Sequence, residues 1–245
     1  MSAAEERLSN NPASELWGEH RARYRFAARF AVGQRVLDVA SGAGFGLRML
    51  RAAGAWPIGI DYDAASLREV RSGDPSARLV NGDATCLSLT DGAIDVVVSF
   101  ETLEHVPDAE AMVRELRRVL KPGGRLILST PNRAFGPPEL HENNPFHVKE
   151  FTAPELRDLL CRSFSHVELY GQLPSDAYRY VPFLLTERRI EPGALAWKLL
   201  TRLPFSVRNS IALLVSGRPF YPAETDYTFE RDNWAAAHAL VAVAY

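Results

Sequence analysis

The sequence predicts an α/β fold, in which a mostly parallel sheet of seven strands has helices on both faces. Short apolar segments alternate with segments of helical period from residue 35 to residue 171. A glycine-rich turn follows the first apolar segment, as expected where a buried parallel strand leads into a helix. Strand–helix alternation of this kind is typical of a parallel sheet that is covered on both sides.

The predicted elements follow one another in a regular order. The first is a helix over 14–31, whose apolar positions recur at helical spacing. The seven strands are expected at 35–40, 57–61, 77–81, 94–100, 125–130, 166–171 and 238–245. The other helices are expected at 45–54, 64–72, 108–119 and 153–162. Thr152, followed by Glu155 three positions later, forms a capping box at the start of the last of these helices.

Residues 173–236 interrupt this alternation between the sixth and seventh strands. They contain prolines and many aromatic residues but no clear strand pattern. Because a connection of this length is usually functional, we expect a helical or irregular insertion that serves as a lid, a substrate-binding region or a dimer surface. Basic and apolar residues are interleaved over 187–218, which also fits a surface for lipid. The chain, 1–245, is expected to be one domain, with 1–31 as an N-terminal helical cap.

Composition and charge exclude several classes of function. The net charge of −2 does not support broad electrostatic binding of nucleic acid. Cys86 and Cys161 lie far apart and fit no metal-binding spacing, so we expect reduced thiols. Apolar runs stay well short of the ~20 residues of a membrane span, and the N-terminus lacks an apolar signal core. These features predict a cytoplasmic protein without stable membrane insertion.

The most informative segment is the glycine-rich turn after the first strand. Asp38 lies within that strand, and Gly42, Gly44 and Gly46 follow at alternate positions. Turns that bind dinucleotides read Gly-x-Gly-x-x-Gly and seat a pyrophosphate. This turn reads Gly-x-Gly-x-Gly behind an acid, which would repel a diphosphate but suits an ammonium group. The spacing therefore disfavours a nicotinamide-dependent enzyme.

Further polar residues follow the other predicted strands. Ligands of open α/β sheets bind beyond the carboxyl ends of the strands. Asp61 ends the second strand, where a carboxylate can accept two hydrogen bonds from a ribose diol. Asp83 lies in the loop after the third strand, where it can accept from the amine of adenine. The fourth strand is followed by Glu101-Thr-Leu-Glu104-His105.

Taken in order, these motifs resemble those of the class I S-adenosylmethionine-dependent methyltransferases. The resemblance covers residues 14–172. It rests on motifs at the intervals of the family, namely Asp38–Gly46, Asp61, Asp83, Leu103–Val106 and Leu120–Leu126. Ala40-Ser41 departs from the Gly-Cys that is common in the family, but the residues remain small. The resemblance implies a Rossmann-like fold, S-adenosyl-L-methionine as cofactor and S-adenosyl-L-homocysteine as product.

The resemblance also implies roles for individual residues. The family's acid at Asp38 lies near the methionine end of the cofactor, the acid at Asp61 binds the ribose hydroxyls, and the acid at Asp83 lies near the adenine. Helix capping is the alternative role for each of these acids. The residues expected to bind the cofactor are Arg23, Tyr24, Asp38, Ala40, Gly42, Gly44, Asp61, Tyr62, Asp83, Ala84, Phe100 and Glu101.

Two segments resemble parts of bacterial enzymes that methylate sugars and surface polysaccharides. The first is the Glu-His-x-x-Arg-Tyr motif of 19–24, where Arg23 could meet the carboxylate of the cofactor. The second is 141–151, which contains Asn-Pro-Phe-His and follows the fifth strand, so that it can overhang the cofactor's methyl group. The alternatives are a solvated helix face for the first and, for the second, a loop that docks helix 153–162 on the sheet.

The resemblance points to methylation of a hydroxyl on a sugar or a glycosylated small molecule. An alcohol must lose its proton, and a histidine that titrates near neutral pH is the natural base. His105 is the favoured base because it follows the fourth strand, and His147 and His141 are the next candidates. A magnesium ion is compatible with this chemistry but is not indicated. Its candidate ligands, in no diagnostic spacing, are Glu101, Glu104, His105 and Glu142.

Other functions stay open at this point. The main alternative is a methyltransferase of another acceptor, such as a quinone, a polyketide or an RNA. A binding module that has lost catalysis is a further alternative. We expect a small-molecule or glycan acceptor and no nucleic acid as partners, and a homodimer is compatible with the sequence.

Overall fold

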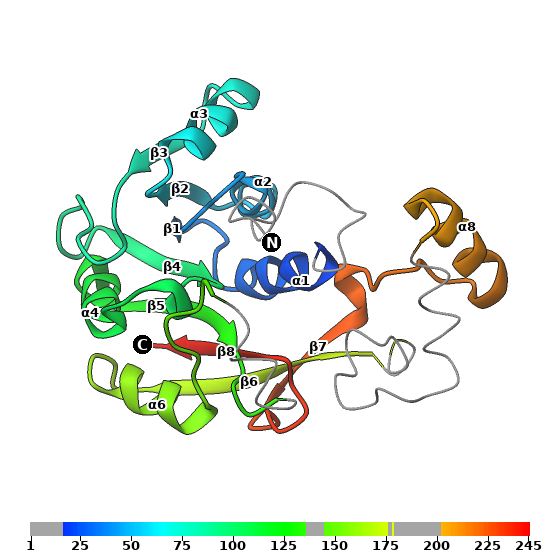
Figure 1. The fold of residues 1–245 in the computed structure, drawn as a ribbon. Coiled ribbons are helices and arrows are strands. Elements are labelled where there is room, and N and C mark those ends of the chain that lie inside the picture. The colour runs from blue at the N-terminus through cyan, green and yellow to red at the C-terminus, as the bar shows by residue number, and fades with distance from the viewer. Residues whose placement is uncertain (1–16, 136–144, 176–177, 179–201) are drawn as a thin grey trace.

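The computed structural model describes residues 17–135, 145–175, 178 and 202–245. Within these ranges, eight strands form one sheet in the order β3-β2-β1-β4-β5-β8-β6-β7 (Figure 1). Strands β1 to β5 pair in parallel, β8 pairs antiparallel with both β5 and β6, and β7 pairs antiparallel with β6. The strands are β1 Arg35–Val39, β2 Trp56–Asp61, β3 Arg78–Asn81, β4 Ile94–Phe100, β5 Leu120–Pro131, β6 Val167–Pro174, β7 Tyr227–Arg231 and β8 Ala239–Ala244.

Helices cover both faces of this sheet. The described helices and 3-10 turns are α1 Trp17–Ala28, α2 Phe45–Ala52, α3 Ala64–Gly73, η1 Leu103–His105, α4 Ala109–Val119, α6 Ala153–Cys161, α8 Phe205–Ser216 and η4 Glu224–Asp226. Alternate residues of β1 separate two cores, because Leu37 packs with residues of α4 and α6 and Val36 packs with residues of α1 and α2. The period of two in a strand then places Asp38 on the side of α1.

The expected fold class is confirmed, and each expected strand and helix is present. β4 has the expected boundaries, and the other elements have shifted ones. The largest shift is in β5, which begins at Leu120 because that residue already pairs with Ile94 of β4. The register then shifts between Ile94 and Val96. The turn over 121–124, with Gly123 at a φ of 76°, makes this irregularity within the strand.

The sequence does not predict β7, which lies inside the expected insertion. This strand reads Tyr-Thr-Phe-Glu-Arg, and only Tyr227 is buried, so its alternation is weak. Its position depends on pairing with β6 and on Phe229, whose ring lies 4.6 Å from that of Phe26 in α1. An edge strand held by such long-range contacts leaves little local signal, and the sheet therefore has eight strands instead of seven.

The described part of the insertion also contains α8, which stands away from the sheet (Figure 1). Leu214 on this helix is 88% exposed. Much of 173–236, notably 179–201, lies outside the described residues, as does the start of the expected cap over 1–31. The role of the insertion as lid, substrate region or dimer surface stays a prediction. Among the described helices, none has the length and apolar character to cross a membrane.

Candidate functional site

The turn between β1 and α2 uses left-handed backbone conformations. Ala40, Gly42 and Gly44 have φ angles of 62°, 50° and 70°. A Cβ on Gly44 would lie 2.8 Å from the methyl groups of Val70 in α3, which is closer than real contacts allow. A Cβ on Gly42 would meet no atom within 4 Å. The turn therefore packs tightly against α3 at Gly44 and leaves an open approach to the backbone at Gly42.

Tyr24 of α1 packs over this turn and links it to Asp38. Gly46 leaves room for the ring, because a Cβ at this position would lie 2.1 Å from Tyr24 Cζ. The Tyr24 hydroxyl donates to Asp38, with its oxygen 3.0 and 3.1 Å from the two carboxylate oxygens. The contact between α1 and α2 thus explains why residue 46 is a glycine, in addition to its place in the turn.

Asp38 is a fully buried acid at the centre of this arrangement. Burial raises the pKa of Asp38 to about 8, the Tyr24 hydrogen bond opposes this rise, and the negative charge of Asp61 adds to it. The carboxyl is therefore mostly protonated at neutral pH. A cation beside it would favour the ionised form. The ammonium group on the methionine part of the expected cofactor is a cation of this kind.

Asp61 at the end of β2 joins the glycine turn to the start of α3. Its Oδ2 accepts from the Gly42 N–H at 2.8 Å, and its Oδ1 accepts from the Asp63 N–H at 2.9 Å. The N-cap of α3 is Asp63, whose side chain accepts from the backbone of Ala65 and Ser66. Asp61 is therefore not the cap of this helix, and each carboxylate oxygen can accept a further bond. Tyr62 beside it is largely exposed.

Asp83 is exposed and stabilises the loop after β3. Its Oδ1 accepts from both the backbone N–H and the hydroxyl of Thr85, each at 2.7 Å. The backbone hydrogen bond from Thr85, followed by the bond from its hydroxyl, lowers the pKa of Asp83. The structure describes every residue between β3 and β4 and no helix lies there, so Asp83 stabilises a turn and caps no helix. Contacts of Asp83 and the adjacent Ala84 with an adenine stay predictions.

The end of β4 places Phe100 and Glu101 beside α1. The ring of Phe100 packs edge-on against that of Tyr24, with centroids 4.9 Å apart. Glu101 has a φ of 49°, which is unusual for a residue with a side chain. Its Oε1 accepts from Ser129 Oγ at 2.7 Å, and its N–H donates to the Ser129 carbonyl. Strain of this kind, fixed by hydrogen bonds, is often found at functional sites.

Arg23 is fully buried and contacts three protein side chains. It forms ion pairs with Glu19 and with Glu101, whose Oε1 lies 3.1 Å from Arg23 Nη1. Its Nε donates to Gln172 Oε1 at 2.6 Å. Burial alone would lower the pKa of Arg23, but Glu101 and Glu19 raise it above its ordinary value. The expected contact of Arg23 with the carboxylate of the cofactor stays a prediction.

Sequence reasoning missed most of the residues around Arg23. His238 Nδ1 lies 3.4 Å from Glu19 Oε1. Burial opposes the charged form of His238, but Glu19 raises its pKa. Glu19 and Arg23 lie one helical turn apart, and this spacing could have predicted their ion pair from the sequence. Gln172 and His238 come from β6 and the approach to β8, far along the chain, and carry no such signal.

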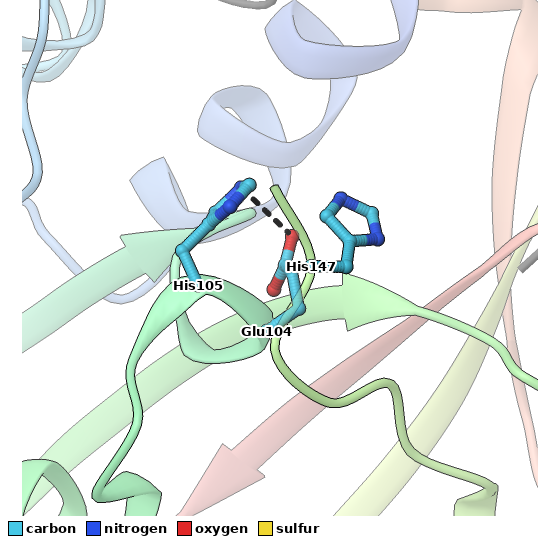
Figure 2. A group of neighbouring side chains, drawn as sticks. All are labelled: Glu104, His105 and His147. Carbon is cyan, nitrogen blue, oxygen red and sulfur yellow. Dashed lines mark ion pairs between the residues drawn. The ribbon is translucent and has the colours of Figure 1, made fainter. Parts of the chain in front are cut away.

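Glu104, His105 and His147 come together beyond the end of β4 (Figure 2). Glu104 and His105 belong to η1, whereas His147 comes from the segment before α6. The two imidazole rings lie edge to face with centroids 4.9 Å apart. One metal-ligating atom from each of the three residues lies within 4.8 Å of the others. The structure thus unites two of the expected bases, and His141 and Glu142 lie outside the described residues.

Hydrogen bonds hold the segment of His147 against η1. The backbone N–H groups of Val148 and Lys149 donate to the Glu104 carbonyl at 2.8 and 3.2 Å. His105 Nδ1 lies 3.0 Å from the carbonyl oxygen of Phe146. The described part of 141–151 is therefore attached to the end of β4.

Glu104 is a buried carboxyl in the centre of this cluster. Its Oε2 accepts from Thr130 Oγ1 at 2.9 Å. Its Oε1 lies 3.9 Å from His105 Nε2, which is too long for a hydrogen bond. Burial and then the negative charge of Glu101 raise the pKa of Glu104 well above its usual range. The cluster therefore contains an acid whose ionisation requires a nearby positive charge.

Comparison with known families shows what part of this chain is similar to. Residues 37–128, less than half of the chain, match the family model described as a methyltransferase domain. We call these residues the methyltransferase domain. The matched range of the methyltransferase domain includes the glycine turn, Asp38, Asp61 and Asp83. S-adenosylmethionine is its cofactor, and the open backbone at Gly42 and the buried acid at Asp38 both fit that molecule.

Several curated proteins from mycobacteria are similar to the methyltransferase domain. A protein of Mycolicibacterium smegmatis named "Probable S-adenosylmethionine-dependent methyltransferase" is 39% identical over 150 residues, which cover 61% of this chain and 58% of the relative. A protein of Mycobacterium tuberculosis named in the same way is 37% identical over 142 residues, 58% of this chain and 52% of the relative. A demethylmenaquinone methyltransferase of Mycobacterium sp. (strain KMS) is 41% identical over 107 residues, 42% of this chain and 46% of the relative. The chain thus spans about half the length of these relatives.

Solved structures share the fold of the methyltransferase domain. An S-adenosylmethionine-dependent methyltransferase from Archaeoglobus fulgidus has a TM-score of 0.62 at 18% identity, covering 94% of each chain. A protein of Thermotoga maritima, described as a possible histamine N-methyltransferase, has a TM-score of 0.58 at 17% identity, covering 95% of this chain and 97% of its own. At these identities the likeness concerns the fold alone.

Proposed function

We propose that this chain transfers a methyl group from S-adenosylmethionine to a hydroxyl oxygen of a sugar or a glycosylated small molecule. The observation that carries the proposal is the position of His105 and His147, whose rings lie 4.9 Å apart beyond the end of β4. A pair of imidazoles at this edge of the sheet can serve a hydroxyl, which reacts only when its proton is removed. The resemblance of 19–24 and 141–151 to sugar-methylating enzymes supports the choice of acceptor.

The chain's own residues would align the acceptor and remove its proton. The cofactor supplies a methyl group on a positively charged sulfur, so that alignment provides much of the rate. His105 Nδ1 lies beside a carbonyl oxygen, which only accepts, so that this nitrogen carries the hydrogen. The lone pair of His105 then lies on Nε2. We assign the hydroxyl proton to this atom when the site contains no metal ion.

The acids at the strand ends would hold the cofactor. In this proposal Asp38 faces the methionine ammonium, Asp61 accepts from the ribose hydroxyls and Asp83 lies beside the adenine. The free acceptor capacity of Asp61 and the pKa of about 8 at Asp38 support the first two roles. Support for the role of Asp83 comes from the resemblance to the family.

A quinone is the second candidate acceptor. The relative from Mycobacterium sp. (strain KMS) is named a demethylmenaquinone methyltransferase, and 107 residues match it at 41% identity. This match covers less than half of either chain, so it supports a shared cofactor site more directly than a shared acceptor. A methyl group found on a carbon of a quinol would favour this candidate.

A methylation screen over glycosides and quinols tests the proposed function. We expect methyl transfer to glycosides, and mass spectrometry with NMR should place the new methyl group on an oxygen. His105→Ala should slow turnover by roughly a hundredfold or more, because general base catalysis contributes about that much. His166→Ala is the matched control, because this ring stacks on Tyr245 away from the cluster. Quinols methylated on carbon with glycosides untouched would overturn the sugar assignment.

A further inference from the structure

We infer that Glu104, His105 and His147 form a binding site for a divalent transition-metal ion, such as zinc or cobalt. Figure 2 shows the three side chains converging from η1 and from the segment before α6. Binding of the ion requires only these residues. Its use in catalysis rests on the proposed function, because the site lies where the acceptor hydroxyl would be.

The distances within the cluster are close to those of a metal site. One ligating atom from each residue lies within 4.8 Å of the other two. Bonds of ~2.1 Å in a tetrahedral site place ligand atoms about 3.4 Å apart. The ligating atoms must therefore approach one another by at most about 1.4 Å when an ion binds.

The outer contacts of both histidines are those expected of metal ligands. His105 Nδ1 lies 3.0 Å from the Phe146 carbonyl oxygen, and His147 Nδ1 lies 2.5 Å from Glu150 Oε1. Each of these two oxygens accepts a hydrogen bond, so Nδ1 of each histidine carries the hydrogen. The lone pair of each ring then lies on Nε2. A carboxylate or carbonyl on the far nitrogen of a ligating histidine fixes the ring and increases its basicity.

Glu104 supplies an independent reason to expect a cation. The residue is 1% exposed, and its Oε1 has no hydrogen-bond donor in the part of the chain that the structure describes. A buried polar atom without a partner destabilises the protein, and more so when it is charged. An ion bound between Oε1 and the two imidazoles would satisfy this oxygen.

The ligand set selects the kind of metal. Imidazole nitrogen suits zinc, cobalt and iron, whereas magnesium prefers oxygen ligands and keeps several waters. Two imidazoles and one carboxylate therefore favour a transition metal over magnesium. Three protein ligands also leave a coordination position open, as in catalytic zinc sites.

The open position gives the ion a chemical role in the proposed reaction. A hydroxyl oxygen bound there would have a lower pKa, because the ion stabilises the alkoxide. Its O–H bond then breaks and the proton goes to solvent. The oxygen electron pair forms the new bond to the methyl carbon, and the carbon–sulfur electron pair stays on sulfur as the neutral thioether product. In this form of the enzyme His105 acts as a ligand and not as the base.

Cobalt binding to the full chain tests this inference without any acceptor. The protein is treated with a chelator, dialysed and titrated with Co²⁺, whose visible absorption reports coordination by imidazole. We expect one equivalent to bind with an absorption band of low-symmetry Co²⁺, to be displaced by Zn²⁺ and to be left in place by excess Mg²⁺. Binding of Mg²⁺ in preference to Co²⁺, or an absence of Co²⁺ binding, would overturn the transition-metal site.

Variants assign the ligands and keep the inference separate from the proposed function. His147→Ala and Glu104→Gln should each weaken Co²⁺ binding by at least about tenfold, whereas His166→Ala should bind as the wild type does. A shift of the melting temperature with S-adenosylhomocysteine shows that each variant is folded. Unchanged binding in both ligand variants would refute the site. Metal binding without glycoside methylation would refute the proposed function alone, and methylation by metal-free protein would refute the catalytic role of the ion.

Discussion

Asp38 shows how one buried carboxyl can be prepared for a positively charged ligand. Its burial on the α1 side of β1 removes water, and the hydrogen bond from Tyr24 only partly compensates for this loss. The pKa of about 8 is a property of the protein without a ligand. A cation that binds beside Asp38 must therefore displace a proton at neutral pH.

The affinity for S-adenosylhomocysteine should increase with pH up to about 8 because of Asp38. Below that value, ionising the buried acid opposes binding, and the dissociation constant should fall by up to about tenfold per pH unit. Calorimetry in buffers of different ionisation enthalpy should show the release of a proton at pH 7. Asp38→Asn is the control, since it cannot titrate and should bind weakly without this slope. A wild-type affinity independent of pH between 6 and 8 would contradict the assignment.

The raised pKa of Asp38 has the opposite effect on the stability of the folded protein, which should decrease as the pH rises. The folded protein holds a proton on Asp38 between pH 4 and 8, whereas the unfolded chain has lost it. The stabilising contribution is therefore fully present below about pH 4 and is lost as the pH rises through 8.

Among the elements, α1 and α2 are joined by a contact that depends on the absence of one side chain. Gly46 in the first turn of α2 lies directly under the ring of Tyr24, so that any Cβ at this position would overlap the ring. The hydroxyl of the same ring bonds Asp38 in β1. Packing between two helices thus positions Asp38, the acid proposed to face the cofactor's ammonium group.

Gly46→Ala should destabilise the protein by about 1–3 kcal/mol, because the added methyl group over-packs a filled site. It should also displace Tyr24 and weaken binding of S-adenosylhomocysteine. Urea unfolding followed by circular dichroism measures the first effect. Gly73→Ala at the end of α3 is the matched control, since its added Cβ meets no atom within 4 Å and should leave stability within about 1 kcal/mol. Equal stabilities of the two variants would show that α2 can move away from α1 without loss.

At the scale of the whole molecule, the sheet brings separate acids to one edge. The parallel strands β1, β2 and β3 are neighbours, so that the loops after them open at the same side. The proposed cofactor site therefore includes residues from several elements, from α1 to the end of β4. A ligand that binds such a site stabilises the fold as a unit.

Saturating S-adenosylhomocysteine should raise the melting temperature by about 5–10 °C. At a hundred times the dissociation constant the ligand adds ~2.7 kcal/mol to the free energy of unfolding, and each kcal/mol corresponds to ~2–4 °C in a chain of this size.

The Asp61→Ala variant should bind S-adenosylhomocysteine more than about tenfold less tightly, because it loses charge-assisted hydrogen bonds to the ribose. Differential scanning fluorimetry measures both. Asp63→Ala is the control, because it removes the cap of α3 and about 1 kcal/mol of stability but should keep the affinity. An unshifted wild type would contradict cofactor binding.

The positions of Asp38 within β1, Gly42 after it and Asp61 at the end of β2 could be predicted from sequence, because strands are visible in the pattern of apolar residues. Their contacts with the cofactor stay predictions. The contacts of Arg23 could not be predicted in this way. It contacts Glu101, which follows β4, and Gln172 in β6, and both lie far along the chain from Arg23.

The sequence by itself determined the order of the strands and helices other than β7 and α8, and the positions of the acids in or directly after the first three strands. These features depend on local periodicity and on short turns. The tertiary structure alone decided the pairing of β7, the pKa of Asp38 and the meeting of His105 with His147. Each depends on burial or on contacts between distant segments, and neither quantity is encoded in the spacing of neighbouring residues.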